Sequence, residues 1–397
     1  MENKTLFGEL PLGWKHVALS DVTTFISRGR QPKYIASVEG IPVINQKMIR
    51  NFTIDYRYVK YNDAKKNINK SVFIKIGDTL VNSTGVGTVG RSAYISIDPM
   101  RPTFVDSHVT IVRPDTAIVD PKFMSVVLSS DVYSNYMGSI LAQGSTGQVE
   151  LSRQKLSKMC IPFPPLNTQH LIGTIFDLID QKIKLNHQIN KNLLRLAKQQ
   201  FNLTFPNVHE GNSRLSNVME NFDRKRIPLA RREREKRQGV YRYVGATSVL
   251  DYVDDYLFDG TYLLMGEDGT VQDEKGFPIL QYIWGKFWPN NHTHVLSGTF
   301  VSTEWLYLFL MNTNVRSRIT GAVQQKISQA NMNSIPLTIP SKDELFRFQK
   351  QIEPVFSQIQ LLDEQNLKLT ATHKLLLPKL LAGQIDLSNL EGAIQNA

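Results

Sequence analysis

The sequence predicts an α+β protein in which two mixed α/β domains follow one another as a tandem repeat. Each domain is followed by a long helix, and the two helices form an antiparallel coiled coil. Three observations support this fold class. A segment of the first half returns in the second half, two stretches carry apolar residues at helical spacing, and the regions before them have short apolar runs rich in Gly, Pro, Thr, Val and aromatic residues. Such runs are typical of strands and loops.

The repeat is clearest where each domain leads into its helix. Residues 151–164 read LSRQKLSKMCIPFP, and residues 327–340 read ISQANMNSIPLTIP, at an offset of 176 residues. Fainter echoes lie upstream, where 19–22 (LSDV) matches 215–218 (LSNV) and 76–85 matches 259–269. The chain therefore divides into a first domain at 1–165, a first spacer helix at 166–206, a second domain at 207–340, and a second spacer helix with a C-terminal tail at 341–397.

Each of the two helical stretches carries an apolar stripe with a 3.5-residue period, which describes a coiled-coil seam. At about 35 residues each helix would be roughly 50 Å long, and a helix of that length needs a partner. Asn190 and Asn366 occupy equivalent seam positions, where a polar Asn commonly fixes register. The alternative is an amphipathic helix packed on its own domain. The predicted seam consists of Ile172, Phe176, Ile179, Ile183, Asn190 and Leu193 in the first helix, and of Phe348, Ile352, Val355, Ile359, Leu362, Asn366 and Leu369 in the second.

Length and composition narrow the class of protein. A chain of 397 residues exceeds what one hydrophobic core usually organises. No stretch of about 18 uncharged apolar residues suggests a membrane span, and no secretory signal is visible, so we expect a cytoplasmic protein. Cys160 is the single cysteine, which excludes an internal disulfide. The formal net charge of +10 makes a polyanion such as nucleic acid a plausible partner.

Several motifs resemble catalytic or metal sites but lack the required context. Residues 85–90 fit the G-x-G-x-x-G dinucleotide pattern, yet the following residues 91–95 alternate like a strand instead of opening a helix, so we expect a turn. We find no phosphate-binding loop and no methyltransferase motif, and therefore predict no catalytic residues. His292 and His294 form a His-x-His pair, which is more often a loop than a metal site, so no metal is expected.

The order of domain, long helix, domain and long helix, together with several short sequence segments, resembles the specificity subunits of type I restriction–modification systems. The matching segments are 12–14 (LGW), 19–22, 77–85, 156–169 and the helical pattern of 179–193. The second copy departs locally, since residues 341–343 (SKD) stand where the first copy has 165–167 (PLN), and Leu345 replaces Gln169. The resemblance covers nearly the whole chain.

The resemblance implies a non-catalytic subunit with two target-recognition domains, each of which reads one half of a bipartite double-stranded DNA site. The helices would act as spacer and as docking surface for two methyltransferase subunits, and restriction subunits would join outside them. S-adenosylmethionine, ATP and Mg would be bound by those partners and not by this chain. A pseudo-twofold arrangement would place the half-sites about 34 Å apart. Two alternatives remain, an enzyme in which methyltransferase and nuclease are fused and a coiled-coil adaptor that binds only protein.

DNA contacts are expected from Lys and Arg side chains to phosphates and from paired donors and acceptors to base edges. The densest basic run, residues 231–237, is interleaved with Glu233 and Glu235, so a solvated, salt-bridged face is its alternative. The candidates in the first domain are Arg28, Arg30, Lys33, Gln46, Lys47, Asn82, Ser83, Thr84, Arg91, Gln143, Ser145 and Gln148. Those in the second domain are Arg224, Lys225, Arg226, Arg231, Arg232, Arg234, Gln324, Gln325 and Lys326.

Overall fold

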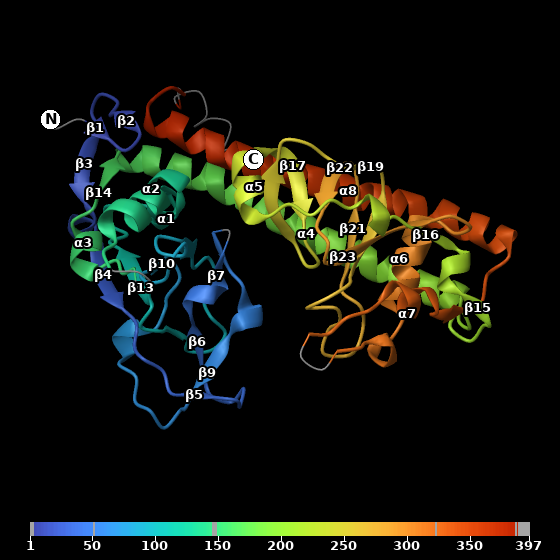
Figure 1. Cartoon of the computed structure of the whole chain (residues 1–397). Helices are drawn as coiled ribbons and strands as arrows, with labels where there is room; N and C mark the ends of the chain where they lie inside the picture. The colour runs from blue at the N-terminus through green and yellow to red at the C-terminus, as the bar shows by residue number, and fades with distance from the viewer. Residues whose placement is uncertain (1–3, 51, 145–148, 322–323, 386, 388–397) are drawn as a thin grey trace. The chain divides into compact units, whose positions relative to one another are not determined.

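The computed structural model describes residues 4–50, 52–144, 149–321, 324–385 and 387. The chain forms two compact units, one made of residues 1–184 and 366–397 and the other of residues 185–365. Each unit contains a globular α/β part and a segment of each of two long helices, α4 (Leu166–Thr204) and α8 (Lys342–Leu381) (Figure 1). The predicted α+β class, with two mixed domains in tandem and a long helix after each, is confirmed.

The globular part of the first unit is built on a four-stranded antiparallel sheet. Its strands lie in the order β11 (Ser92–Tyr94), β10 (Thr79–Asn82), β13 (Val109–Pro114) and β4 (Thr23–Arg28). Strand β10 is buried throughout, because α1 (Pro121–Ser129) covers one face of this sheet and a second sheet packs on the other. Helix α1 begins at Asp120, whose Oδ1 accepts the Phe123 amide at 2.7 Å, with Pro121 in the first turn.

The second sheet of this unit has one parallel pair. Its order is β12 (Phe104–Val105), β6 (Ile41–Ile44), β9 (Lys60–Asn62) and β5 (Tyr34–Ile35), and β12 runs parallel to β6. The other strands form the pairs β1 (Lys4–Thr5) with β2 (Gly8–Glu9), β3 (Lys15–Ala18) with β14 (Cys160–Phe163), and β7 (Ile49–Arg50) with β8 (Thr53–Ile54). The shorter helices are η1 (Leu19–Asp21), η2 (Gln46–Met48), η3 (Tyr56–Tyr58), η4 (Lys70–Val72), α2 (Asp131–Tyr136), η5 (Met137–Leu141) and α3 (Arg153–Ser157).

The globular part of the second unit repeats this plan. Its antiparallel sheet has the order β16 (Met219–Asn221), β23 (Thr293–Gly298), β20 (Tyr262–Gly266) and β21 (Leu280–Ile283). Its other four-stranded sheet has the order β18 (Val249–Val253), β17 (Gln238–Val244), β22 (Lys286–Pro289) and β19 (Phe258–Asp259), and β17 runs parallel to β22. The remaining elements are β15 (Ser213–Arg214) paired with β24 (Pro336–Leu337), η6 (Leu215–Asn217), η7 (Asp223–Lys225), α5 (Arg231–Lys236), α6 (Thr303–Met311), η8 (Arg316–Arg318) and α7 (Gln329–Asn333).

In each unit the segments of α4 and α8 lie side by side (Figure 1). In the second unit Asn190 Nδ2 donates to Asp363 Oδ1 at 2.8 Å, and Gln200 Nε2 donates to Gln351 Oε1 at 3.0 Å. Residue numbers therefore rise along one helix as they fall along the other, which is the antiparallel pairing that the sequence predicts. In the first unit the rings of Phe176 and His373 meet at 4.6 Å.

The G-x-G-x-x-G segment forms a turn between β10 and β11, as predicted. Gly85, Gly87 and Gly90 have φ angles of 98°, 71° and 83°, which residues with a side chain rarely adopt. The strand expected over residues 91–95 is β11, so no helix follows the glycines and the dinucleotide interpretation is excluded at this segment. Among the described helices, none combines the length and apolarity needed to cross a membrane.

Candidate nucleic-acid interface

A polar corner forms in the first unit where β10 ends and β13 begins. We name as the first corner the residues Gln46, Asn82, Ser83, Thr84 and His108. Asn82 Nδ2 donates to the Gln46 carbonyl at 3.1 Å, and Thr84 Oγ1 lies 3.2 Å from Gln46 Oε1 and 2.8 Å from His108 Nδ1. The Ser83 amide donates to the His108 carbonyl at 2.8 Å. Asn82 and Ser83 are fully buried, so the structure places these two predicted contacts inside the fold as supports. The donors and acceptors that a base edge could reach are those of Gln46, Thr84 and His108, which three chain segments bring together.

Arg28 supports the first corner from behind. Its Nη1 forms an ion pair with Glu150 Oε1 at 2.7 Å, and its Nη2 donates to the Leu151 carbonyl at 2.8 Å. The Leu151 amide in turn donates to the Ser83 carbonyl at 2.8 Å, and the Gln143 amide donates to the Glu150 carbonyl at 2.9 Å. Because its guanidinium is engaged within the chain, Arg28 positions the corner and is not an open phosphate contact.

The second unit contains an equivalent corner where β20 ends and β23 begins. We name as the second corner the residues Glu267, Asp268, His292, Gln325 and Lys326. The Glu267 amide donates to the His292 carbonyl at 2.9 Å, and His292 Nδ1 lies 2.5 Å from Asp268 Oδ1. The Gly269 amide donates to the Gln325 carbonyl at 2.9 Å. The exposed fractions of the His292 and Lys326 side chains, 50% and 49%, leave both accessible to a ligand.

A charged network supports the second corner from the inside. His294 is fully buried, with Nδ1 2.6 Å from Asp223 Oδ2 and Nε2 2.9 Å from the Ile327 carbonyl. Burial by itself would raise the pKa of the Asp223 carboxyl, but the hydrogen bond and charge of His294 and the Val295 amide lower it overall. Arg226 Nη1 pairs with Glu267 Oε2 at 2.7 Å and contacts two backbone carbonyls. Arg226 is therefore part of the corner's interior and not an exposed contact.

The basic run on and beside α5 divides into exposed and engaged side chains. Arg224, Lys225, Arg231 and Arg232 are exposed, although Arg231 also pairs with Glu235 at 3.0 Å. Arg234 is held by Asp251 at 3.2 Å and by the Leu229 carbonyl at 2.8 Å, and its guanidinium stacks over a tyrosine ring. The salt-bridged alternative thus holds for Arg231, Arg234 and Arg237, the last of which pairs with Asp254 at 2.8 Å. Arg224, Lys225 and Arg232 face solvent.

The remaining predicted DNA contacts are mostly exposed side chains. Lys33 is exposed but pairs with Asp63 at 3.0 Å. Ser145 and Gln148 lie outside the described residues. The other exposed candidates are Arg30, Lys47, Arg91, Gln143, Gln324, Gln325 and Lys326.

The predicted seam residues are all buried or half-buried, and several of them also pack in the core of a globular part. Ile172 and Phe176 belong to the hydrophobic core of the first unit, and Phe348 and Ile352 belong to that of the second. Each helix therefore packs both on its partner helix and on a globular part, so the two packing modes that the sequence left as alternatives occur together. The other seam residues are Ile179, Ile183, Asn190, Leu193, Val355, Ile359, Leu362, Asn366 and Leu369.

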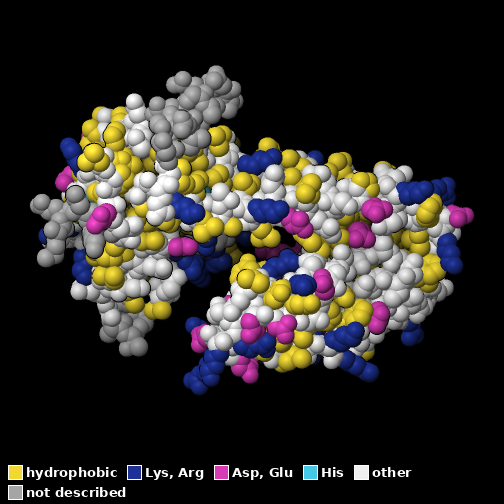
Figure 2. Space-filling model, turned by 90° about the horizontal axis from the view of Figure 1, so that it is seen from above, with side chains coloured by type: hydrophobic (Ala, Val, Ile, Leu, Met, Phe, Trp, Pro, Cys, Tyr) yellow, Lys and Arg dark blue, Asp and Glu magenta, His cyan; other side chains and the backbone are white. Residues whose placement is uncertain are grey.

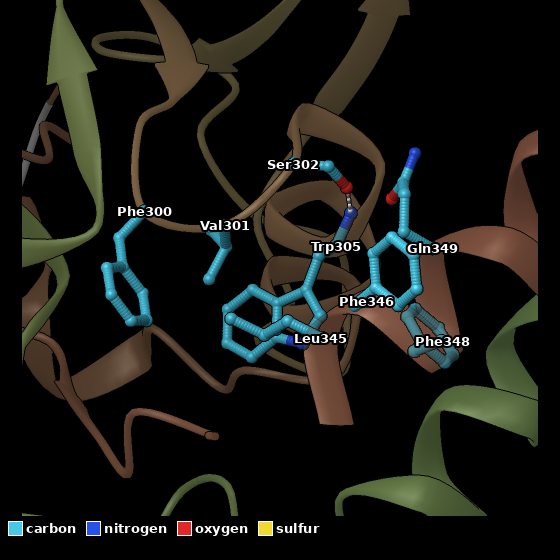
Figure 3. Close-up of a pocket in the computed structure, with 8 residues that line it drawn as sticks. All are labelled: Phe300, Val301, Ser302, Trp305, Leu345, Phe346, Phe348 and Gln349. Atoms are coloured by element: carbon cyan, nitrogen blue, oxygen red, sulfur yellow. Dashed lines mark hydrogen bonds between the residues drawn. The ribbon is translucent and has the colours of Figure 1, made fainter. Parts of the chain in front are cut away.

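The substitution of Gln169 by Leu345 has a structural consequence at the start of each helix. In the first unit Gln169 Oε1 accepts the Asp120 amide at 3.0 Å, and His170 Nδ1 contacts Asp120 Oδ2 at 2.8 Å. In the second unit the equivalent place is an apolar cavity of about 230 Å³. Figure 3 shows the side chains that line it from α6, α8 and the loop before α6: Phe300, Val301, Ser302, Trp305, Leu345, Phe346, Phe348 and Gln349.

One group of described residues has the composition of a metal site. Asp223, Glu267 and His294 place their ligand atoms within 4.8 Å of one another. The two carboxylates are already paired with cations of the chain, since Arg226 contacts Asp223 at 3.5 Å and Glu267 at 2.7 Å, and Lys326 contacts Glu267 at 3.4 Å. A metal ion would have to displace these partners, so the group is better explained as an internal ion network.

Sequence reasoning missed the acidic and histidine residues of the corners. Glu150 and Asp268 were not candidates, and His292 was considered only as part of a metal pair. The repeat itself carried the missing signal, because 76–85 aligned with 259–269 places Ser83 and Thr84 near Glu267 and Asp268. Extending that alignment to the strands that follow would have brought His108 and His292 together.

Comparisons with known proteins agree with this duplicated plan. The chain matches the family model described as "Type I restriction modification DNA specificity domain" over residues 11–195 and 210–371. It is 27% identical over 196 residues to the type I restriction enzyme HindI specificity subunit of Haemophilus influenzae, covering 48% of this chain and 40% of that protein. It is 21% identical over 432 residues to the type I restriction enzyme MjaIX specificity subunit of Methanocaldococcus jannaschii, covering 98% and 97% of the two chains.

The extent of these matches varies. Two further relatives, from Haemophilus influenzae and Methanocaldococcus jannaschii, are matched over only 26% and 46% of their lengths. Among solved structures, the S subunit of a type I restriction–modification system from M. genitalium superposes with a TM-score of 0.52 at 15% identity, over 96% of this chain and 99% of that one. At this identity the likeness establishes the fold.

Proposed function

This chain belongs to the family of type I restriction modification DNA specificity proteins, and we propose that it is the DNA-recognition subunit of a type I restriction–modification complex. In this role it is non-catalytic. Each globular part reads one half of a bipartite duplex target, and the complex acts on cellular DNA in the cytoplasm. Methyltransferase and restriction subunits supply the chemistry and bind S-adenosylmethionine, ATP and Mg.

The observation that carries this proposal is the duplicated corner. Equivalent backbone hydrogen bonds hold the two corners, with Ser83 and Glu267 donating to His108 and His292 at 2.8 and 2.9 Å. A bipartite target needs two reading sites of the same construction with different side chains, because each half-site has its own bases. The two corners have the same construction and different side chains, which supports the proposal.

Phosphate contacts are the proposed source of affinity. Arg224, Lys225, Arg231 and Arg232 are exposed in the second unit, and Arg30, Lys47 and Arg91 are exposed in the first. These cations, with the net charge of +10, support electrostatic attraction to a polyanion.

The long helices offer a docking surface for protein partners. Leu185, Leu196 and Leu203 on α4 are 51%, 56% and 78% exposed. Their spacings of 11 and 7 residues return to nearly the same side of the helix. On the face of the molecule that Figure 2 shows, hydrophobic side chains lie among the charged ones. We propose that this row of exposed leucines is a protein interface and assign it to the methyltransferase subunits.

Binding to a random DNA library tests the proposal. The chain is purified with its methyltransferase subunit, mixed with random-sequence duplexes, and the bound fraction is sequenced. We expect enrichment of one bipartite sequence with a fixed gap, and binding that weakens as salt rises, with a slope of about −0.9 per phosphate contact. A stable complex that retains no DNA at low salt would contradict the proposal and favour a protein-only adaptor.

A further inference from the structure

The two corners can be aligned residue by residue through their backbone hydrogen bonds. Leu151 donates to Ser83 at 2.8 Å, and Ile327 donates to Glu267 at the same distance. Gly85 donates to Val149 at 3.1 Å, and Gly269 donates to Gln325 at 2.9 Å. Ser83 therefore corresponds to Glu267, and by the next position along the chain Thr84 corresponds to Asp268.

The histidines at the corners also correspond. His108 immediately precedes β13 and His292 immediately precedes β23. The His108 amide donates to Asp106 Oδ1 at 2.9 Å, and the His292 amide donates to Asn290 Oδ1 at 3.0 Å. In each corner the Nδ1 atom of the histidine contacts the side chain at the aligned position, which is Thr84 in one unit and Asp268 in the other.

The side chains at these aligned positions differ in the chemistry they present. Thr84 has a hydroxyl, which both donates and accepts, whereas Asp268 has a carboxylate, which only accepts. A carboxylate can accept about four hydrogen bonds, so the bond from His292 leaves Asp268 acceptor capacity for a further donor. The exposed fraction of the Asp268 side chain is 21%, so it can be reached from solvent while its orientation is fixed by His292.

The supports beneath the two corners show that each is built separately. In the first unit Arg28 on β4 pairs with Glu150 at 2.7 Å, just before the segment that donates to Ser83. In the second unit the corresponding loop residue is Lys326, which pairs with Glu267 at 3.4 Å. Each corner is thus braced by an ion pair. The loop residue of that pair is an anion, Glu150, in the first unit and a cation, Lys326, in the second. Such bracing holds a reading side chain in one conformation before DNA binds.

We propose that these aligned pairs are specificity determinants, with Thr84 and His108 reading one base pair of the first half-site and Asp268 and His292 reading the corresponding one of the second. The inference rests on the proposed function and names the residues through which it acts. A carboxylate at a base edge accepts from the amino group of cytosine. Asp268 therefore selects a base pair with cytosine at its position, and Thr84 makes the first half-site different there.

The test changes one acceptor into an amide and reads the recognised sequence. The Asp268→Asn variant is purified with the methyltransferase subunit and mixed with the same random-duplex library, followed by sequencing of the bound DNA. We expect a changed preference at one position of one half-site, with the other half-site and the gap retained. Binding to the parental sequence should weaken about tenfold or more, because one base contact is lost. Thr84→Val should change the other half-site instead.

Two further variants make the result interpretable. Glu220→Gln alters an exposed carboxylate in the same globular part, opposite Ser297 near the end of β23 that is farther from His292, and should leave the recognised sequence unchanged. If the Asp268→Asn complex cannot be purified, His292→Gln is used instead. It changes the histidine that contacts Asp268, and the bound DNA is sequenced in the same way. If the Asp268 or His292 variant and the Thr84 variant still select the parental sequence, the inference is overturned and the proposed function stands. A parental complex that selects no bipartite sequence overturns the proposed function together with the inference.

Discussion

At the scale of single residues, the guanidinium groups show why a basic sequence is not the same as a DNA-binding surface. Arg226 and Arg231 lie five residues apart, but Arg226 is held by Glu267 at 2.7 Å, whereas the side chain of Arg231 is 85% exposed. A guanidinium held by a largely buried carboxylate is not free to bind phosphate, whereas the exposed pair of Arg231 with Glu235 is weak. The exposed members of the run are therefore the ones to test for contacts with phosphate.

Charge reversal at Arg231 and Arg232 should weaken DNA binding for all sequences to a similar extent. The expected cause is loss of phosphate contacts, so the salt dependence should flatten by about one per lost contact. Binding isotherms at several salt concentrations measure both effects. Lys275→Glu combined with Lys342→Glu, which reverses two exposed cations of the same unit, is the matched control. Unchanged binding by the double variant would remove these arginines from the interface.

The corner side chains could not be predicted from the sequence as a set. Thr84 meets Gln46 and His108, which lie 38 and 24 positions away, and Arg28 meets Glu150 across 122 positions. Sequence reasoning placed Arg28, Gln46 and Thr84 among many polar residues because each lies in a polar segment. Only the pairing of β10 with β13, and of β13 with β4, shows which of them converge.

At the scale of elements, the helices were predictable because their signal is local. A stripe of apolar residues repeating every 3.5 positions is visible in the sequence, and α4 and α8 span 39 and 40 residues where about 35 were expected. Packing of a helix on a globular part was one of the two alternatives, but its partners were not predictable, because Phe201 meets Trp305 and Phe348 only in the folded chain.

His373 on α8 should make stability depend on pH. Its ring lies between Phe176 and Phe52, at 4.6 and 5.4 Å, and burial lowers its pKa, with Asp180 partly opposing this. Lys122, Asp131 and Lys374 also act on it. A lowered pKa in the folded state means that stability is present above the unfolded pKa, near 6.5, and is lost as pH falls through the folded value.

Thermal unfolding at pH 7.5 and 5.5 measures this effect. The Tm of the parental chain should be lower at pH 5.5 than at pH 7.5. The decrease should be smaller for His373→Gln, because glutamine does not titrate. His187→Gln, an exposed histidine on α4, is the matched control and should behave like the parent. Equal pH dependence in parent and His373→Gln would show that this histidine does not link protonation to folding.

Lengthening a spacer helix tests its role as a ruler. Insertion of one heptad adds about 10 Å to a helix and preserves the 3.5-residue period. We expect either an altered gap between the half-sites or loss of assembly, with the same bases recognised in each half-site. Sequencing of bound duplexes gives the result, and a changed base preference would contradict the spacer role.

At the scale of the whole molecule, duplication explains both the construction and the proposed assembly. One plan of two sheets is used twice, as β11-β10-β13-β4 and β21-β20-β23-β16 show, and each copy is joined to segments of the same two helices. The sequence repeat predicted that one domain plan is used twice, but not its two sheets or their strand order. It did not predict the apolar cavity beside Leu345, which arises where the second copy lacks the polar contacts of Gln169.

Leu196→Lys should disrupt docking of the methyltransferase subunit while the chain itself stays folded. Leu196 is 56% exposed, so a lysine there costs the fold little but places a charge in the proposed interface. Co-purification and the mass of the complex in solution measure the effect. His187→Lys, an exposed residue nine positions from Leu196 and so on the opposite side of the same helix, adds a lysine as a control. Undiminished assembly with Leu196→Lys would place the docking surface elsewhere.

The most direct test of DNA recognition is a map of base methylation across a genome. A host without its own type I system expresses this chain with its methyltransferase subunit, and long-read sequencing locates the methylated bases. The account predicts one bipartite motif with a fixed gap, absent when either subunit is omitted. A stable complex of the two subunits that adds no methylation would contradict it.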